Sequence, residues 1–138
     1  MTNDKNRDVT VFKQARPRRV PRPNVWRVVY VQAGAGLILL AVAGLWFPGT
    51  VQAVMAAVML SVIGHSYFTW RSMRHYGARI TGLFVTGTSQ GLYGKWIIVA
   101  FGLALLWTAH PDLNAFAMLL TVLVLNTLAA ALAPFLVK

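Results

Sequence analysis

Four long apolar stretches, separated by short polar segments, dominate the sequence. Three of them contain no Lys, Arg, Asp or Glu and cover residues 28–47, 51–70 and 113–137. The fourth covers 80–107 and changes from a mildly polar first part to a strongly apolar second part. A helix needs about 20 mostly apolar residues to cross a bilayer, so the pattern predicts four transmembrane helices. It leaves open whether residues 80–94 form one helix with the rest of this span.

Short turns connect the predicted helices in pairs. Pro48 and Gly49 lie between the first and second helices, and residues 110–112 (His-Pro-Asp) lie between the third and fourth. Because such short connections place consecutive helices side by side in opposite directions, we expect two antiparallel hairpins. The predicted fold class is an all-α integral membrane protein with a four-helix transmembrane domain at residues 26–138.

Basic residues are confined to a few segments, which indicates the orientation in the membrane. Eight of the 13 Lys and Arg residues precede the first span: Lys5, Arg7, Lys13, Arg16, Arg18, Arg19, Arg22 and Arg27. Three more lie between the second and third spans: Arg71, Arg74 and Arg79. Cytoplasmic loops are enriched in Lys and Arg, so we expect both termini and this middle loop in the cytoplasm.

Residues 1–25 form a polar, basic segment in which proline and arginine recur. Proline removes a backbone amide and restricts the residue before it, so we expect a disordered or polyproline-like arm. Seven arginines of the arm and the middle loop are expected at the membrane surface, near anionic lipids: Arg16, Arg18, Arg19, Arg22, Arg71, Arg74 and Arg79. The alternative is a docking arm for a cytosolic partner. No aromatic residues alternate with these charges, so we expect no nucleic-acid binding.

Small residues lie on one face of the third span. They are Gly87, Gly91, Gly94 and Gly102, and transmembrane helices associate closely through faces of this kind. The favoured interpretation is packing within this bundle. The alternative is a face that receives another membrane protein, in which case these glycines contact a partner.

Polar side chains inside the spans are the candidate functional residues, because they are costly in a membrane. They are Gln32, Ser61, His65, Lys95, Thr121 and Asn126. We expect Gln32 and Asn126 to form interhelical hydrogen bonds. For His65 we favour a neutral ring hydrogen-bonded inside the bundle, with a proton-linked or partner-contacting role as the alternative.

Lys95 is the most unusual of these residues, since it is a cation in a chain with few acids. We favour an interpretation in which its side chain snorkels towards the lipid phosphates on the cytoplasmic side. If Lys95 is paired instead, the carboxylate comes from a lipid or another protein. The acids of the chain itself are Asp4, Asp8 and Asp112, and none of them lies in a span.

This composition does not suggest an enzyme. Only 12% of the residues are charged, against about 25% in soluble domains, which leaves no separate catalytic domain. Without paired carboxylates or cysteines, the spans contain no acid–base pair or thiolate site. The three histidines are expected at different depths: His65, His75 and His110. We therefore predict no catalytic residues, no bound metal and no cofactor.

Three short motifs resemble those of the ATP synthase protein I family, the small membrane subunit I encoded with bacterial F-type ATP synthases. They are MRHYGAR at Met73–Arg79, GLYGK at Gly91–Lys95 and LAPFLVK at Leu132–Lys138. Gln32 also matches a polar position that is usual in the family, and the resemblance covers about residues 26–138.

The chain departs from the family pattern at three places within the spans. Leu92 stands where the family usually has the glutamate of a Gly-Glu-x-x-Lys element. Residues 64–65 (Gly-His) replace a usual Pro-Asn, and residues 126–127 (Asn-Thr) stand where a glutamine is frequent. Lys95 therefore keeps its place without the acidic neighbour that an ion-handling role would require.

The resemblance implies a non-enzymatic subunit or assembly factor of the F-type ATP synthase in the bacterial inner membrane. Its expected partner is the c subunit, whose ring it would help to assemble, with contacts through the third and fourth spans. The alternatives are a subunit of a cation channel or transporter (for magnesium or linked to protons) and a permanent structural subunit of a membrane complex. The sequence leaves the oligomeric state open.

Overall fold

The computed structural model describes residues 23–74 and 81–136. These residues form four α-helices and a short 3-10 helix: α1 (Trp26–Trp46), η1 (Pro48–Thr50), α2 (Val51–Met73), α3 (Thr81–Ala109) and α4 (Ala115–Leu136). Each α-helix is long and apolar enough to cross a membrane. The predicted all-helical chain, with four helices long and apolar enough to span a membrane, is confirmed for this part of the sequence. The third span is one continuous helix.

Several predicted features lie outside the described residues. These are the basic arm up to residue 22, with Arg16, Arg18, Arg19 and Arg22, and residues 75–80 of the middle loop, with His75 and Arg79.

Local sequence explains where the helices begin and end. Proline has no amide hydrogen to donate, and α1 ends just before Pro48, with the Phe47 amide donating to the Ala43 carbonyl at 2.8 Å. The N-terminus of α4 is capped by Asn114, whose Oδ1 accepts a hydrogen bond from the Ala117 amide at 3.0 Å. An asparagine at this position satisfies one of the free amides of the first turn.

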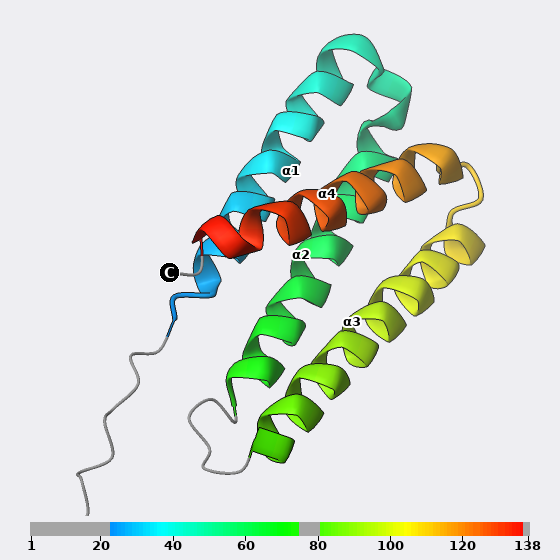
Figure 1. The fold of residues 1–138 in the computed structure, drawn as a ribbon. Helices are drawn as coiled ribbons and strands as arrows, with labels where there is room; N and C mark the ends of the chain where they lie inside the picture. The colour runs from blue at the N-terminus through cyan, green and yellow to red at the C-terminus, as the bar shows by residue number, and fades with distance from the viewer. Residues whose placement is uncertain (1–22, 75–80, 137–138) are drawn as a thin grey trace, which may run out of the picture.

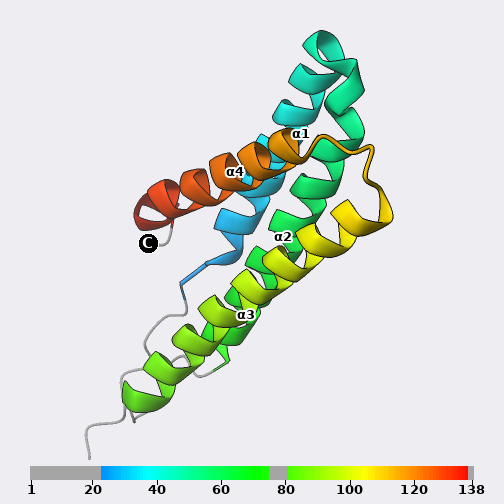
Figure 2. The ribbon, with the colours of Figure 1, turned by 90° about the vertical axis from the view of Figure 1, so that its right-hand side faces the viewer.

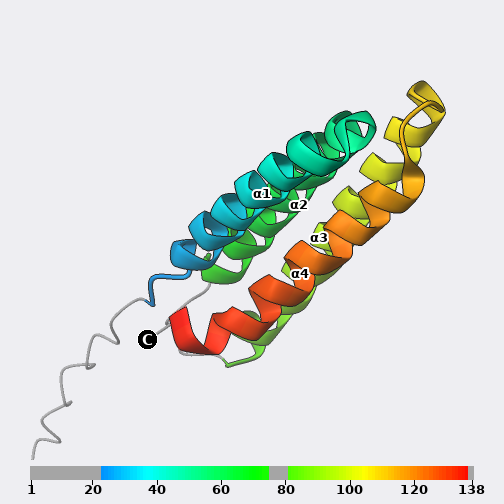
Figure 3. The same ribbon diagram turned by 90° about the horizontal axis from the view of Figure 1, so that it is seen from above.

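The helix α2 is the centre of the bundle. It packs against α1, α3 and α4, while α4 also packs on α1. Figure 1 shows α3 running along α2, whereas α4 crosses α2 and diverges from α3. The side view of Figure 2 shows the same divergence. In Figure 3, α1 and α2 lie side by side along their length.

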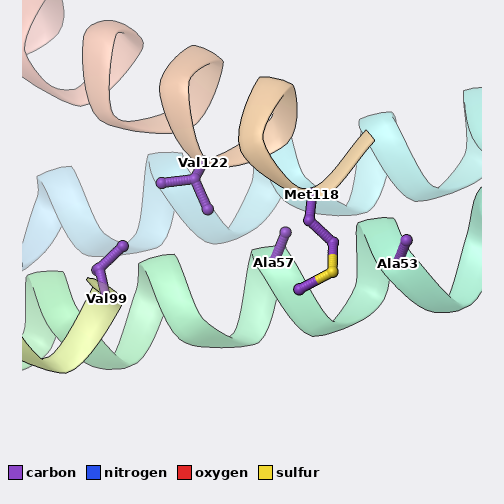
Figure 4. Close-up of a cluster of buried hydrophobic side chains, with 5 residues drawn as sticks. All are labelled: Ala53, Ala57, Val99, Met118 and Val122. Carbon is purple, nitrogen blue, oxygen red and sulfur yellow. The ribbon is translucent and has the colours of Figure 1, made fainter. Parts of the chain in front are cut away.

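The apolar core occupies the half of the bundle nearer the α1–α2 and α3–α4 connections. One cluster joins α2, α3 and α4 and consists of Ala53, Ala57, Val99, Met118 and Val122. In Figure 4 the side chains of Met118 and Val122 point from α4 towards α2. A second cluster joins α1, α2 and α4: Ala43, Val54, Val58 and Leu125. Alanine on α2 lets α4 approach closely, as small residues do in membrane helix packing.

Two apolar cavities border this half of the bundle. One of about 370 Å³ lies between α1, α2 and α4, with Leu39, Val54 and Phe116 in its wall. The other, of about 350 Å³, lies between α3 and α4 close to their connection, with Leu103, Trp107 and Met118 in its wall. The other half of the bundle, nearer the N-terminus of α1, has a more polar interior.

Candidate functional site

Polar side chains are buried in the half of the bundle nearer the N-terminus of α1. We call them the buried polar set: Gln32 of α1, Ser61, His65, Thr69 and Ser72 of α2, and Lys95 of α3. Thr69 and Ser72 were not predicted from the sequence. Their spacing could have indicated them: Ser61, His65, Thr69 and Ser72 follow one another at intervals of four, four and three residues, which places them on one face of α2.

Lys95 is the charged member of the buried polar set. It is only 7% exposed, and its Nζ lies 3.5 Å from Nδ1 of His65 across the α2–α3 contact. The ammonium also lies 5.7 Å from the centre of the Trp96 ring, within the range of a cation–π contact. The predicted snorkelling of Lys95 to lipid phosphates is wrong, because the side chain turns inward to α2.

The contact with His65 also places Lys95 along the bundle. His65 lies five residues before Trp70 on α2, or about 8 Å at about 1.5 Å per residue. Lys95 therefore lies between the middle of the bundle and the end that carries Trp26, Trp70 and Arg74.

Several members of the buried polar set form no hydrogen bond within the described part of the chain. They are both polar atoms of the Gln32 amide and the hydroxyls of Ser61, Thr69 and Ser72. A buried polar group without a partner costs about 1–3 kcal/mol. Most buried polar groups in proteins do have partners, either other protein groups or ordered water.

The interhelical hydrogen bonds predicted for Gln32 and Asn126 are not formed among the described residues. Asn126 instead donates from Nδ2 to the Val122 carbonyl of its own helix at 2.8 Å. Thr121 likewise donates to the Ala117 carbonyl at 2.7 Å. Bonds of this kind satisfy a polar side chain within its own helix. The sequence pattern does not distinguish them from hydrogen bonds between helices.

The glycine face of α3 packs against α2. A side chain at Gly91 would meet Ser72 Oγ at 3.2 Å and the Phe68 carbonyl at 3.3 Å, and one at Gly94 would meet the Tyr67 ring. Gly102 faces Leu60 in the same way, and Gly87 is buried. These glycines are therefore used within the chain, and a partner would meet the opposite face of α3.

That opposite face of α3 is apolar and exposed. It carries large side chains that are half or more exposed: Tyr93, Trp96 and Ile97. Phe101 and Leu105, further along α3, are exposed as well. Among the membrane-spanning windows of the four helices, that of α3 has the smallest share of buried residues. In a membrane this face is available to lipid or to another helix.

Two of the basic residues predicted at the membrane surface can be placed. Arg71 donates from Nη2 to Oε1 of Gln90, which ties the end of α2 to α3. Arg74 lines an open hollow of about 430 Å³ with Trp26, Trp70 and Met73. Tryptophan and arginine together at one end of the bundle are typical of a membrane–water interface.

Residues that bind metals or carry out acid–base chemistry are not gathered at one place. Within residues 23–74 and 81–136, no group of three His, Cys, Asp or Glu side chains could hold a metal ion. His110 and Asp112 are exposed in the α3–α4 connection, far from His65. The chemistry that the buried polar set can perform is hydrogen bonding to an acceptor, through one cation and several hydroxyls.

Comparison with known proteins gives no relative. No protein-family model matches the chain, and no curated protein or solved structure is similar to it. The resemblance to ATP synthase protein I therefore rests on the three sequence motifs. The structure places Gly91–Lys95, the motif of the third span, at the contact between α2 and α3.

Proposed function

We propose that this chain is a non-enzymatic membrane subunit or assembly factor of an F-type ATP synthase, with the c subunit as its partner. The observation that carries the proposal is Lys95, a buried cation with no carboxylate beside it among the described residues. A buried charge without a counter-ion is unfavourable for the chain alone. It is explained if a partner supplies the missing group, as expected of a protein that binds another membrane protein.

The position of Lys95 also disfavours the alternative of a cation path. Cation channels line their paths with acidic side chains or carbonyl groups. In this bundle the central charge is positive, and it lies beside a histidine. The ammonium would repel a metal ion or a second proton in the apolar interior.

We further propose that the helices form two hairpins in the bacterial inner membrane, with both termini in the cytoplasm. The basic residues support this orientation, because Arg71 and Arg74 lie at the α2 end opposite the Pro48–Thr50 turn. The half of the bundle that contains the buried polar set then faces the cytoplasm.

Cysteine labelling of intact cells tests the orientation, and the chain has no cysteine of its own. We expect Gly49→Cys and Asp112→Cys to react with a membrane-impermeant maleimide. Arg74→Cys is the matched position at the other end and should react only after permeabilisation. Labelling of Arg74→Cys in intact cells, with protection of the other two, would reverse the proposed topology.

Co-purification tests the partner. The chain, tagged at its C-terminus and present at native level in gently solubilised membranes, should recover the c subunit in less than stoichiometric amounts. The control uses cells that lack the other synthase subunits and are supplied with the c subunit. A direct contact between the chain and the c subunit persists in these cells. Recovery of the chain without any synthase subunit would contradict the proposed function.

A further inference from the structure

Lys95 is a buried cation with no anion beside it among the described residues. The lysine ammonium can donate three hydrogen bonds, and His65 is its polar neighbour at 3.5 Å. Ser61 and Thr69 lie one helical turn to either side of His65 on α2, and their buried hydroxyls form no hydrogen bond within the described residues. A buried ammonium with spare hydrogen-bonding capacity is complementary to an anionic group.

The chain cannot provide that anion from a span, either in this copy or in a second one. Its acids are Asp4, Asp8 and Asp112, and Asp112 follows the end of α3, about 20 Å from Lys95. A homo-oligomer brings the same three acids, none of which lies in a span. A carboxylate carried by a transmembrane helix must therefore come from a different protein.

The burial of Lys95 favours a protein carboxylate over a lipid phosphate. Its ammonium lies between α2 and α3, 3.5 Å from His65, and the residue is only 7% exposed. Lipid phosphates lie outside the hydrocarbon core. A glutamate or aspartate in a transmembrane helix of another protein can lie at the level of Lys95.

An approach for such a helix exists on the side of α3 that α2 leaves uncovered. There α4 diverges from α3 (Figure 1), and the exposed side chains include Leu92 and Trp96. The Lys95 ammonium lies against the Trp96 ring, so it is at the border between the α2–α3 contact and this exposed face. For a partner on this face to reach the ammonium, the flexible four-carbon stem of Lys95 has to change its rotamer.

We propose that Lys95, supported by His65, is the docking point for one carboxylate carried at the level of Lys95 by a transmembrane helix of a different protein, packed on the uncovered face of α3. The carboxylate would receive hydrogen bonds from the ammonium and neutralise its charge. This proposal rests on the proposed function only for the identity of the partner. The chemistry that selects the partner follows from the described residues.

Synthetic transmembrane helices test the docking point without using the synthase. The full chain is placed in bilayer nanodiscs of phosphatidylcholine with a Leu/Ala helix that carries one central Glu, or Gln in its place, and association is measured by energy transfer. We expect the Glu helix to bind about tenfold more tightly than the Gln helix, as for one charge-assisted hydrogen bond. Lys95→Met should remove this difference and Lys95→Arg should retain part of it.

The control variant is Thr108→Val, which changes an exposed polar side chain on the same helix and should bind both helices as the natural chain does. Equal binding of the Glu and Gln helices, or a preference that survives Lys95→Met, would overturn the proposal. Competition by added phosphatidylglycerol would assign the site to a lipid phosphate instead. Preference for the Glu helix together with failure to recover the c subunit would retain the docking point and reject the synthase as partner.

Discussion

Lys95→Met is expected to leave the isolated protein folded and to raise its thermal stability. Methionine has a length similar to that of lysine and no charge, so it fills the space beside His65 without the cost of a buried ion. Replacing buried charges by apolar residues of similar volume is often neutral, or stabilises by about 1–4 kcal/mol. For a chain of this size, this corresponds to a rise in Tm of about 3 °C or more.

Thermal unfolding in mild detergent, followed by tryptophan fluorescence, measures this effect. Lys95→Ala is the matched control, since it also removes the charge but leaves a cavity that costs stability. We expect the Tm of the Ala variant to lie below that of the Met variant by several degrees. If Lys95→Met lowered the Tm, the contact between Lys95 and His65 would stabilise the chain by itself. The charge would then need no partner to explain it.

The sequence was sufficient to predict the helices but not their neighbours. Hydropathy locates the four spans because each is a continuous apolar run, and the bounds differ from the structure by only a few residues. Each helix is apolar on all sides, so no apolar stripe indicates which face is covered by its neighbours. That α4 packs on α1 and α2 and diverges from α3 follows from close packing at residues such as Ala53 and Ala57.

The candidate site was predictable residue by residue, but not as an arrangement. Lys95 and His65 were both recognised as costly in a membrane, yet they are 30 residues apart and no pattern links them. Snorkelling was the wrong expectation because it treats α3 as a single helix in lipid. Once α2 covers one face, His65 lies 3.5 Å from the ammonium.

A second large effect is expected from a substitution at the close contact between α2 and α3. Gly91→Leu is expected to destabilise the bundle by about 2–3 kcal/mol, since extra side-chain volume in a packed contact forces the backbones apart. The contact is with backbone as well as side chain, because a Cβ at Gly91 would meet the Phe68 carbonyl at 3.3 Å. A carbonyl in the middle of a helix cannot turn aside.

Gly44→Leu is the matched control. It introduces the same side chain into α1, where nothing lies within 4 Å of the added Cβ, and both changes gain the same helix propensity. The difference between the two variants in unfolding experiments in mixed micelles therefore reports packing alone.

A cysteine crosslink shows whether the loss of stability comes from separation of α2 and α3. The tips of the Arg71 and Gln90 side chains are hydrogen-bonded across this contact, so Arg71→Cys with Gln90→Cys should be joined by a short bifunctional maleimide crosslink in the otherwise cysteine-free chain. We expect Gly91→Leu to slow its formation strongly and Gly44→Leu to leave it unchanged. Rapid crosslinking and unchanged stability in Gly91→Leu would mean that α3 does not pack on α2 through its glycine face. The buried position of Lys95, and the docking point derived from it, would then lose their structural basis.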